Sequence, residues 1–189
     1  MLKRIYLVIF GGLLITSDFA QTVITMQPDA ILGKDATIDS RYPDINRGSQ
    51  TDFDAVSWTV DGIPVTFRSL LEFDLSSIHN SDILNATLFL YNDPLSLNNN
   101  GDHASLTGSN IGWLRMITEE WHEDNVTWAN QPAVTTKNQV VIPQSESPHQ
   151  DYVINVTDLV QEMVCNPTIS HGFMLLLQTE AAYRCLVFG

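Results

Sequence analysis

The chain has 189 residues, of which 22 are acidic and 9 basic, so its formal net charge at pH 7 is −13. A surface this acidic repels nucleic acid and anionic membranes, which argues against a role in binding either of them. The length suits a single domain, and a hydrophobic content of 44% is enough to bury a core.

The first segment, residues 1–20, has the pattern of an export signal. Lys3 and Arg4 supply the positively charged start, and residues 5–15 form an apolar run too short to span a bilayer. We place the cleavage after Ala20. The sequence therefore predicts a secreted bacterial protein, extracellular or at the cell surface and not inserted in the membrane, with one folded domain over residues 21–189.

Short alternating or apolar runs follow, separated by clusters of Asn, Asp, Gly and Pro, which is typical of all-β proteins. One segment differs, because residues 157–164 have helical spacing, with Thr157 or Asp158 as N-cap and Asn166-Pro167 as the stop. We predict an antiparallel β-sandwich of the jelly-roll type with one short helix. The predicted strands span residues 36–38, 55–60, 68–75, 86–91, 111–117, 151–156, 172–178 and 183–188.

Alternation within these strands predicts which side chains point away from the core. Phe89 and Tyr91 share the outer face of one strand, and Trp113 and Arg115 share the outer face of another. Arg68 points outward at the start of a third strand. The side chains predicted to face the core are Ser69, Leu71, Phe73, Leu75, Ala86, Leu88, Leu90, Gly112, Leu114 and Met116.

Catalytic motifs are absent from the sequence. His122-Glu123 invites comparison with zinc peptidases, but these need H-E-x-x-H on a helix, and no second histidine follows. The chain has no G-x-S-x-G, no P-loop and no pair of acids that stands out as a glycosidase pair. The sequence therefore predicts a protein that is not an enzyme and requires no cofactor.

Oxygen-bearing side chains are abundant enough to hold a structural calcium ion. One candidate group lies near the first strand, and a second lies in the loop around residues 98–102, although neither has the spacing of a complete calcium loop. The candidates are Asp35, Asp39, Asp44 and Asn46 in the first group, and Asn98, Asn100 and Asp102 in the second.

The two cysteines, Cys165 and Cys185, leave two alternatives open. They can pair as a disulfide in an oxidising compartment, or they can remain as two buried free thiols. A folded domain of this size does not need the bridge for stability.

Six segments, taken in order, resemble the DNRLRE-domain proteins of bacterial secretomes, a group related to disaggregatase-type repeats and to carbohydrate-binding module family 96. The likeness covers roughly residues 27–189 and is most specific in "WHEDNVTWANQP", residues 121–132. It implies a jelly-roll sandwich, often attached to polysaccharide-degrading enzymes, that binds acidic polysaccharide such as alginate in members with known ligands. It also implies a further strand and further domains after Gly189. The segments are residues 35–50, 68–78, 86–93, 121–132, 154–164 and 172–180.

The opening of that specific segment holds two tryptophans around an acidic turn. We predict that Trp121, Glu123 and Trp128 are structural, because two indoles bury a large area where the chain crosses between sheets. A sugar-stacking surface is the weaker alternative for this segment.

We therefore predict a module that binds a polysaccharide of cell-wall or algal type. Sugar rings stack on exposed aromatic faces, and polar side chains fix the hydroxyl or carboxylate groups. The acidity of the chain opposes an anionic glycan, so a neutral glycan is an equal alternative. A structural or adhesive surface module without a small ligand is the second alternative, and a polysaccharide-degrading enzyme is the third. The predicted ligand-binding residues are Trp113, Arg115, Arg68, Tyr91 and Phe89.

Overall fold

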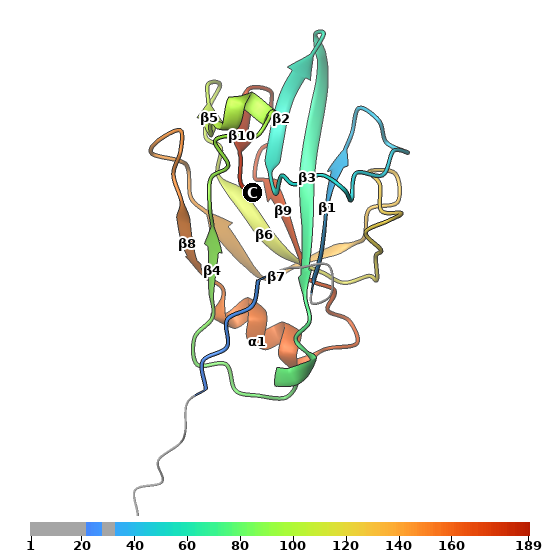
Figure 1. The fold of residues 1–189 in the computed structure, drawn as a ribbon, viewed down its shortest axis with the longest axis vertical. Helices are drawn as coiled ribbons and strands as arrows, with labels where there is room; N and C mark the ends of the chain where they lie inside the picture. Colours follow the sequence, from blue (N-terminus) through green and yellow to red (C-terminus); the bar gives the residue numbers. More distant parts are fainter. Residues whose placement is uncertain (1–21, 28–32) are drawn as a thin grey trace, which may run out of the picture.

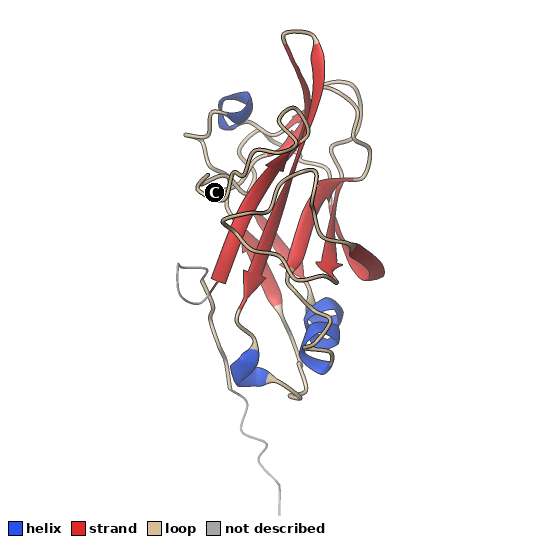
Figure 2. Ribbon diagram, turned by 90° about the vertical axis from the view of Figure 1, so that its right-hand side faces the viewer, coloured by secondary structure: helices blue, strands red, loops and turns tan. Residues whose placement is uncertain are grey.

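The computed structural model describes residues 22–27 and 33–189, so the predicted export signal lies outside the described residues. These residues form two antiparallel sheets, one short α-helix and two 3₁₀ turns (Figure 1, Figure 2). The predicted all-β sandwich with one helix is confirmed.

The larger sheet is strongly curled. Its strands are β1 (Gly33–Asp39), β2 (Ala55–Val60), β3 (Ile63–Phe73), β5 (Ala104–Ser105), β6 (Gly112–Ile117), β7 (Val134–Ile142), β9 (Phe173–Leu177) and β10 (Arg184–Leu186). Their order is β5-β10-β2-β3-β9-β6-β7, and β1 also pairs with β3. The smaller sheet pairs β4 (Thr87–Leu90) with β8 (Tyr152–Asn155). The 3₁₀ turns are η1 (Ser76–Ile78) and η2 (Asn98–Gly101).

The main core lies between the two sheets. Leu88 and Leu90 of β4 enter it from the smaller sheet, and Leu114 and Met116 of β6 enter it from the larger one. The alternation predicted for these two strands is therefore correct. Because a strand points successive side chains to opposite faces, the residues between them point away from this core.

A second core covers the outer face of the larger sheet. Leu70, Met174 and Leu176 lie in it, together with Trp121 and Val126 from the segment 118–133 that crosses over this face. The prediction that only alternate residues of β3 are buried is wrong for this reason, since Leu70 and Leu71 are both buried. All five residues of β9 are buried as well, as in strands that are covered on both faces.

The helix α1 (Thr157–Cys165) lies across one end of the sandwich (Figure 1). Leu159, Met163 and Val164 form its buried face. The predicted N-cap is wrong, because Val156 occupies that position without a side-chain cap, and the Thr157 hydroxyl instead accepts a hydrogen bond of 2.9 Å from the backbone N–H of Ala86. In the described part of the chain, no helix is long and apolar enough to cross a bilayer.

Two strands, β5 and β7, were not predicted, and two begin earlier than predicted, β1 at Gly33 and β3 at Ile63. The pairing of β7 with β6 is interrupted in the middle of β7. The register shifts there, because Leu114 is opposite Val140 but Met116 is opposite Thr135. Strand β3 begins five residues earlier than predicted, at Ile63, directly after a tight turn at Asp61-Gly62. Both turn residues have positive φ, 54° and 76°, as a two-residue hairpin requires. This hairpin projects beyond the sandwich (Figure 1).

Candidate functional site

The predicted ligand-binding residues lie on two opposite sides of the sandwich. Phe89 and Tyr91 point outward from the smaller sheet and are 54% and 59% exposed. Trp113 and Arg115 leave β6 on the outer side of the larger sheet, because Leu114 between them enters the main core. Among the described residues β4 pairs only with β8, so the two aromatic groups do not form one platform.

On the larger sheet, Trp113 and Arg68 flank one buried leucine. Trp113 is opposite Leu176 of β9. The β3–β9 register, in which Ser69 is opposite Leu175, continues to place Arg68 beside the same leucine. Two strand spacings separate Trp113 from Arg68, which is about 10 Å between backbones. These two predicted residues therefore share a face and a row.

Arg68 is already fully engaged by protein groups. Its Nε and Nη2 donate to the two carboxylate oxygens of Glu180 at 2.7 and 2.8 Å, and its Nη1 donates to Oε1 of Gln131 at 2.7 Å. Its guanidinium also lies 4.6 Å from the ring centroid of Trp128. A two-pronged bond to a carboxylate is a strong one. Arg68 thus holds the segment 118–133 against the sheet and has little left for a ligand.

Arg115 is placed differently. Its Nε donates to Oε1 of Gln139 at 2.9 Å, and its guanidinium carbon lies 5.7 Å from the ring centroid of Trp113. Within the described residues its terminal nitrogens have no hydrogen-bond partner, it pairs with no carboxylate, and these nitrogens are not sealed from solvent. A half-buried arginine beside an indole therefore keeps donors for an outside group.

Trp121 is held from several sides. It is 3% exposed, and its indole N–H donates to the carbonyl oxygen of His171 at 2.8 Å. The ammonium of Lys34 lies 4.6 Å above the ring and donates to the carbonyl oxygen of Trp121 at 2.7 Å. An indole in this position offers no face to a sugar, and its contacts join β1, the 118–133 segment and the loop before β9.

The turn around Glu123 is fixed through its backbone. The side-chain amide of Asn46 donates to the carbonyl oxygens of Glu123 and Val126, at 2.6 and 2.8 Å. Gly48 touches the same turn so closely that a Cβ there would collide with the Glu123 carbonyl oxygen. Burial raises the pKa of the Glu123 carboxyl, and the neighbouring acids Asp35 and Asp124 raise it further. The residues that fix this turn are Asn46 and Gly48, and Asn46 belongs to one of the predicted calcium groups.

The family comparison follows the same residues. The family model for carbohydrate-binding module family 96 matches residues 28–185, and this range contains the smaller sheet and all of the larger sheet except the last residue of β10. The chain belongs to carbohydrate-binding module family 96. The resemblance found in the sequence is confirmed. A comparison with curated proteins gives no match.

Membership of this family shows the general function of the domain, which is to bind carbohydrate. The domain is a carbohydrate-binding module, a class that binds carbohydrate and is typically non-catalytic. A site in such a module needs an aromatic face and nearby hydrogen-bond donors. Trp113 with Arg115 provides both on one strand, and the indole is partly exposed while it also packs against the second core. Phe89 with Tyr91 provides aromatic rings alone.

Several members of the predicted calcium groups are engaged by protein groups. Asp39 is buried and forms an ion pair with Arg47 at 2.7 Å, and the side-chain amide of Asn46 donates to the carbonyl oxygen of Glu123. In the loop group, Asp102 lies 2.7 Å from Nε2 of His149. Within residues 22–27 and 33–189, no three side chains of the His, Cys, Asp and Glu types come together as metal ligands.

The cysteines of the module are both free. Cys165 is exposed at the end of α1, and Cys185 is buried in β10, where its Sγ lies 3.2 Å from the carbonyl oxygen of Asp102. Of the two alternatives that the sequence left open, the disulfide is not formed. The alternative of two buried free thiols holds for Cys185 only.

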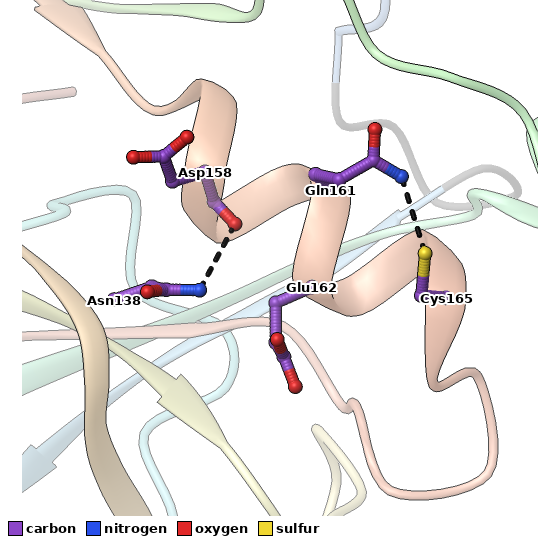
Figure 3. A pocket seen from close by; sticks show the side chains of 5 residues that line it. All are labelled: Asn138, Asp158, Gln161, Glu162 and Cys165. Atoms are coloured by element: carbon purple, nitrogen blue, oxygen red, sulfur yellow. Dashed lines mark hydrogen bonds between the residues drawn. The ribbon is translucent and has the colours of Figure 1, made fainter.

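A shallow pocket of about 320 Å³ lies between α1 and β7 (Figure 3). Its lining is polar apart from one thiol. Two of the lining side chains already donate hydrogen bonds within the pocket: Asn138 to the carbonyl oxygen of Asp158, and Gln161 to Sγ of Cys165. No aromatic side chain lines it. A sugar ring would find nothing to stack on here, so we do not assign the carbohydrate site to this pocket.

Proposed function

We propose that this module is exported and binds a polysaccharide of cell-wall or algal type, without cleaving it, through Trp113 and Arg115 of β6. The observation that carries the proposal is the pairing of an indole with an arginine that has no carboxylate partner in the described part of the chain. Side chains two apart on a strand emerge on one face about 6–7 Å apart, which suits contacts to adjacent groups of a glycan. The indole stacks on a pyranose ring, and the guanidinium donates to its hydroxyl or carboxylate oxygens.

The charges around this surface favour a glycan that is neutral or carries few charges. Arg68, the other arginine on this face, is already neutralised by Glu180, which leaves Arg115 as the basic group of the site. The chain as a whole has a formal charge of −13. A polyuronate with a carboxylate on every unit would meet only one unpaired guanidinium here, against an acidic background.

The test is a titration of the purified chain against neutral and acidic polysaccharides by isothermal calorimetry. Stacking and a charged hydrogen bond are each worth about 1–2 kcal/mol, so Trp113→Ala and Arg115→Ala should each weaken binding by about 5- to 30-fold. The matched control is Phe89→Ala with Tyr91→Ala on the opposite face, which should bind as the parent does. Each variant is first checked by circular dichroism for the parent's fold at the titration temperature, because Trp113 also packs against the second core and its truncation lowers stability.

Two outcomes would contradict the proposal. If the Phe89 and Tyr91 variant loses binding while the Trp113 and Arg115 variants keep it, the site lies on the smaller sheet. If the parent chain binds no glycan of a broad panel, the structural or adhesive alternative replaces the binding function. Export is tested separately, by expressing the whole chain in a bacterium and determining whether the exported protein begins at Gln21.

A further inference from the structure

Among the described residues, Asp54, just before β2, is the most deeply buried carboxylate. It is 0% exposed. Its Oδ2 accepts a hydrogen bond of 2.6 Å from the side-chain amide of Asn98, but its Oδ1 is sealed from solvent without any hydrogen-bond partner. The nearby hydroxyl of Ser69 does not serve Oδ1, because it donates to the backbone carbonyl of Asp54 at 2.8 Å. A buried acceptor left unpaired is rare and costly in proteins.

The surroundings of Asp54 are acidic. Asp52 repels the charge of Asp54, and Asp93 in turn repels that of Asp52. Among the described residues, no Lys, Arg or His forms an ion pair with Asp52 or Asp54. Buried charges in proteins are normally paired or bound to a metal ion. This carboxylate pair has no such counter-charge from the chain.

A single amide group lies between the two carboxylates. The Nδ2 of Asn98, from η2, donates to Oδ2 of Asp54 at 2.6 Å and to Oδ2 of Asp52 at 3.2 Å. This amide nitrogen thus stands where a cation would bridge the two carboxylates. Half a turn of the amide about its last bond would direct Oδ1 of Asn98 to the same point, and the two orientations of an amide are close in shape. Asp52 and Asn98 are only partly buried, which leaves an approach from solvent.

We propose that Asp52, Asp54 and Asn98 form a binding site for a calcium ion. The ion supplies the positive charge that the pair of carboxylates lacks and gives Oδ1 of Asp54 a partner. Calcium accepts 6–8 oxygen ligands in flexible geometry, so two carboxylates, one amide oxygen, main-chain carbonyl groups and water can complete its shell. Magnesium is disfavoured because it requires near-ideal octahedral geometry and gives up its water reluctantly. The site joins η2 to the start of β2 at the end of the sandwich that carries β5 and β10 (Figure 1).

This site is separate from the proposed glycan surface. The calcium residues lie before β2 and in η2, whereas Trp113 and Arg115 lie on β6. Calcium binding can therefore be measured without any sugar, and its failure would leave the glycan proposal untouched.

The experiment compares thermal unfolding of the whole EDTA-treated chain with and without added calcium chloride. At a free calcium concentration a hundredfold above Kd, the melting temperature should rise by about 5–10 °C. Magnesium chloride at the same concentration should raise it much less. Calorimetric titration should give one calcium ion per chain.

Variants locate the ion. Asp54→Asn keeps the shape and removes the charge, so the calcium-dependent rise should disappear; Asp52→Asn, at a less buried position, should weaken calcium binding at least tenfold. The control is Asp44→Asn, which changes an exposed acid elsewhere and should leave the rise intact. The proposal is overturned if the parent chain shows neither heat nor a temperature shift with calcium. It is also overturned if Asp52→Asn and Asp54→Asn both respond as the parent does.

Discussion

Replacing Trp121 by alanine tests whether the segment 118–133 is held by packing. The indole is 3% exposed, it contacts the second core, and its N–H is bonded to the carbonyl oxygen of His171 at 2.8 Å. Truncating a buried Trp to Ala typically costs about 3–5 kcal/mol, and this truncation also leaves the His171 carbonyl without its donor. For a domain of this size, that corresponds to a fall in melting temperature of about 6–20 °C.

The assay is urea unfolding followed by far-ultraviolet circular dichroism. Trp121→Phe serves as the comparison, because it keeps one aromatic ring but removes the N–H donor and part of the buried ring area, so it should cost less than Trp121→Ala. If Trp121→Ala lowers the free energy of unfolding by less than about 1 kcal/mol, the segment is not held by this residue and the structural role is wrong.

Three further predictions concern Asp54, the two cysteines and Gly48. Burial raises the pKa of Asp54 to about 7, so without calcium the folded state keeps a proton that the unfolded state releases, and stability falls as the pH rises from about 4 to above 7. Relative to Asp54→Asn, the parent in EDTA should lose about 4 kcal/mol over that range, and parallel pH profiles would contradict this. An aromatic disulfide reagent should label one thiol in the folded chain, the exposed Cys165, and both in denaturant, because burial raises the pKa of Cys185 to about 12. Gly48→Ala should lower the free energy of unfolding by about 1–3 kcal/mol in urea denaturation, since its Cβ collides with the Glu123 carbonyl; an unchanged midpoint would disprove the close contact.

Local alternation predicted the orientation of side chains well. Leu88, Phe89, Leu114 and Trp113 point as predicted, because each lies in a short strand with one face on the main core. The same argument failed for Leu70, since a loop more than forty positions later in the chain covers the outer face of β3. Local pattern cannot reveal such a cover.

The start of β3 and the whole of β7 were missed in the sequence for different reasons. The hairpin between β2 and β3 carried a strong signal, an Asp-Gly pair between alternating runs, which Pro64 obscured. The strand β7 was hidden by its polar middle, where Asn138 adopts a positive φ of 53° and the ladder is interrupted. An Asp-Gly turn can be found in the sequence, but a strand such as β7 is recognised only from its pairing with β6.

The candidate site could be predicted only in part. The sequence placed Trp113 and Arg115 on one face, which the strand geometry requires. It could not separate Phe89 and Tyr91 from them, because strand neighbours are set by long-range pairing. It also gave no sign that Glu180 neutralises Arg68, or that Asp54 is buried, since both depend on contacts with residues far away in the sequence.

The most direct test of the carbohydrate surface is a nuclear magnetic resonance titration. A glycan that the module binds is added to the ¹⁵N-labelled module, and the indole N–H resonances of its 4 tryptophans are followed. We predict that the Trp113 resonance moves and saturates with the glycan, because this indole forms the stacking face, whereas the Trp121 resonance stays in place, because its N–H is bonded to His171 inside the protein. A saturating change at the backbone amides of Phe89 and Tyr91, recorded in the same ¹⁵N spectra, with the Trp113 indole unmoved, would contradict the assignment.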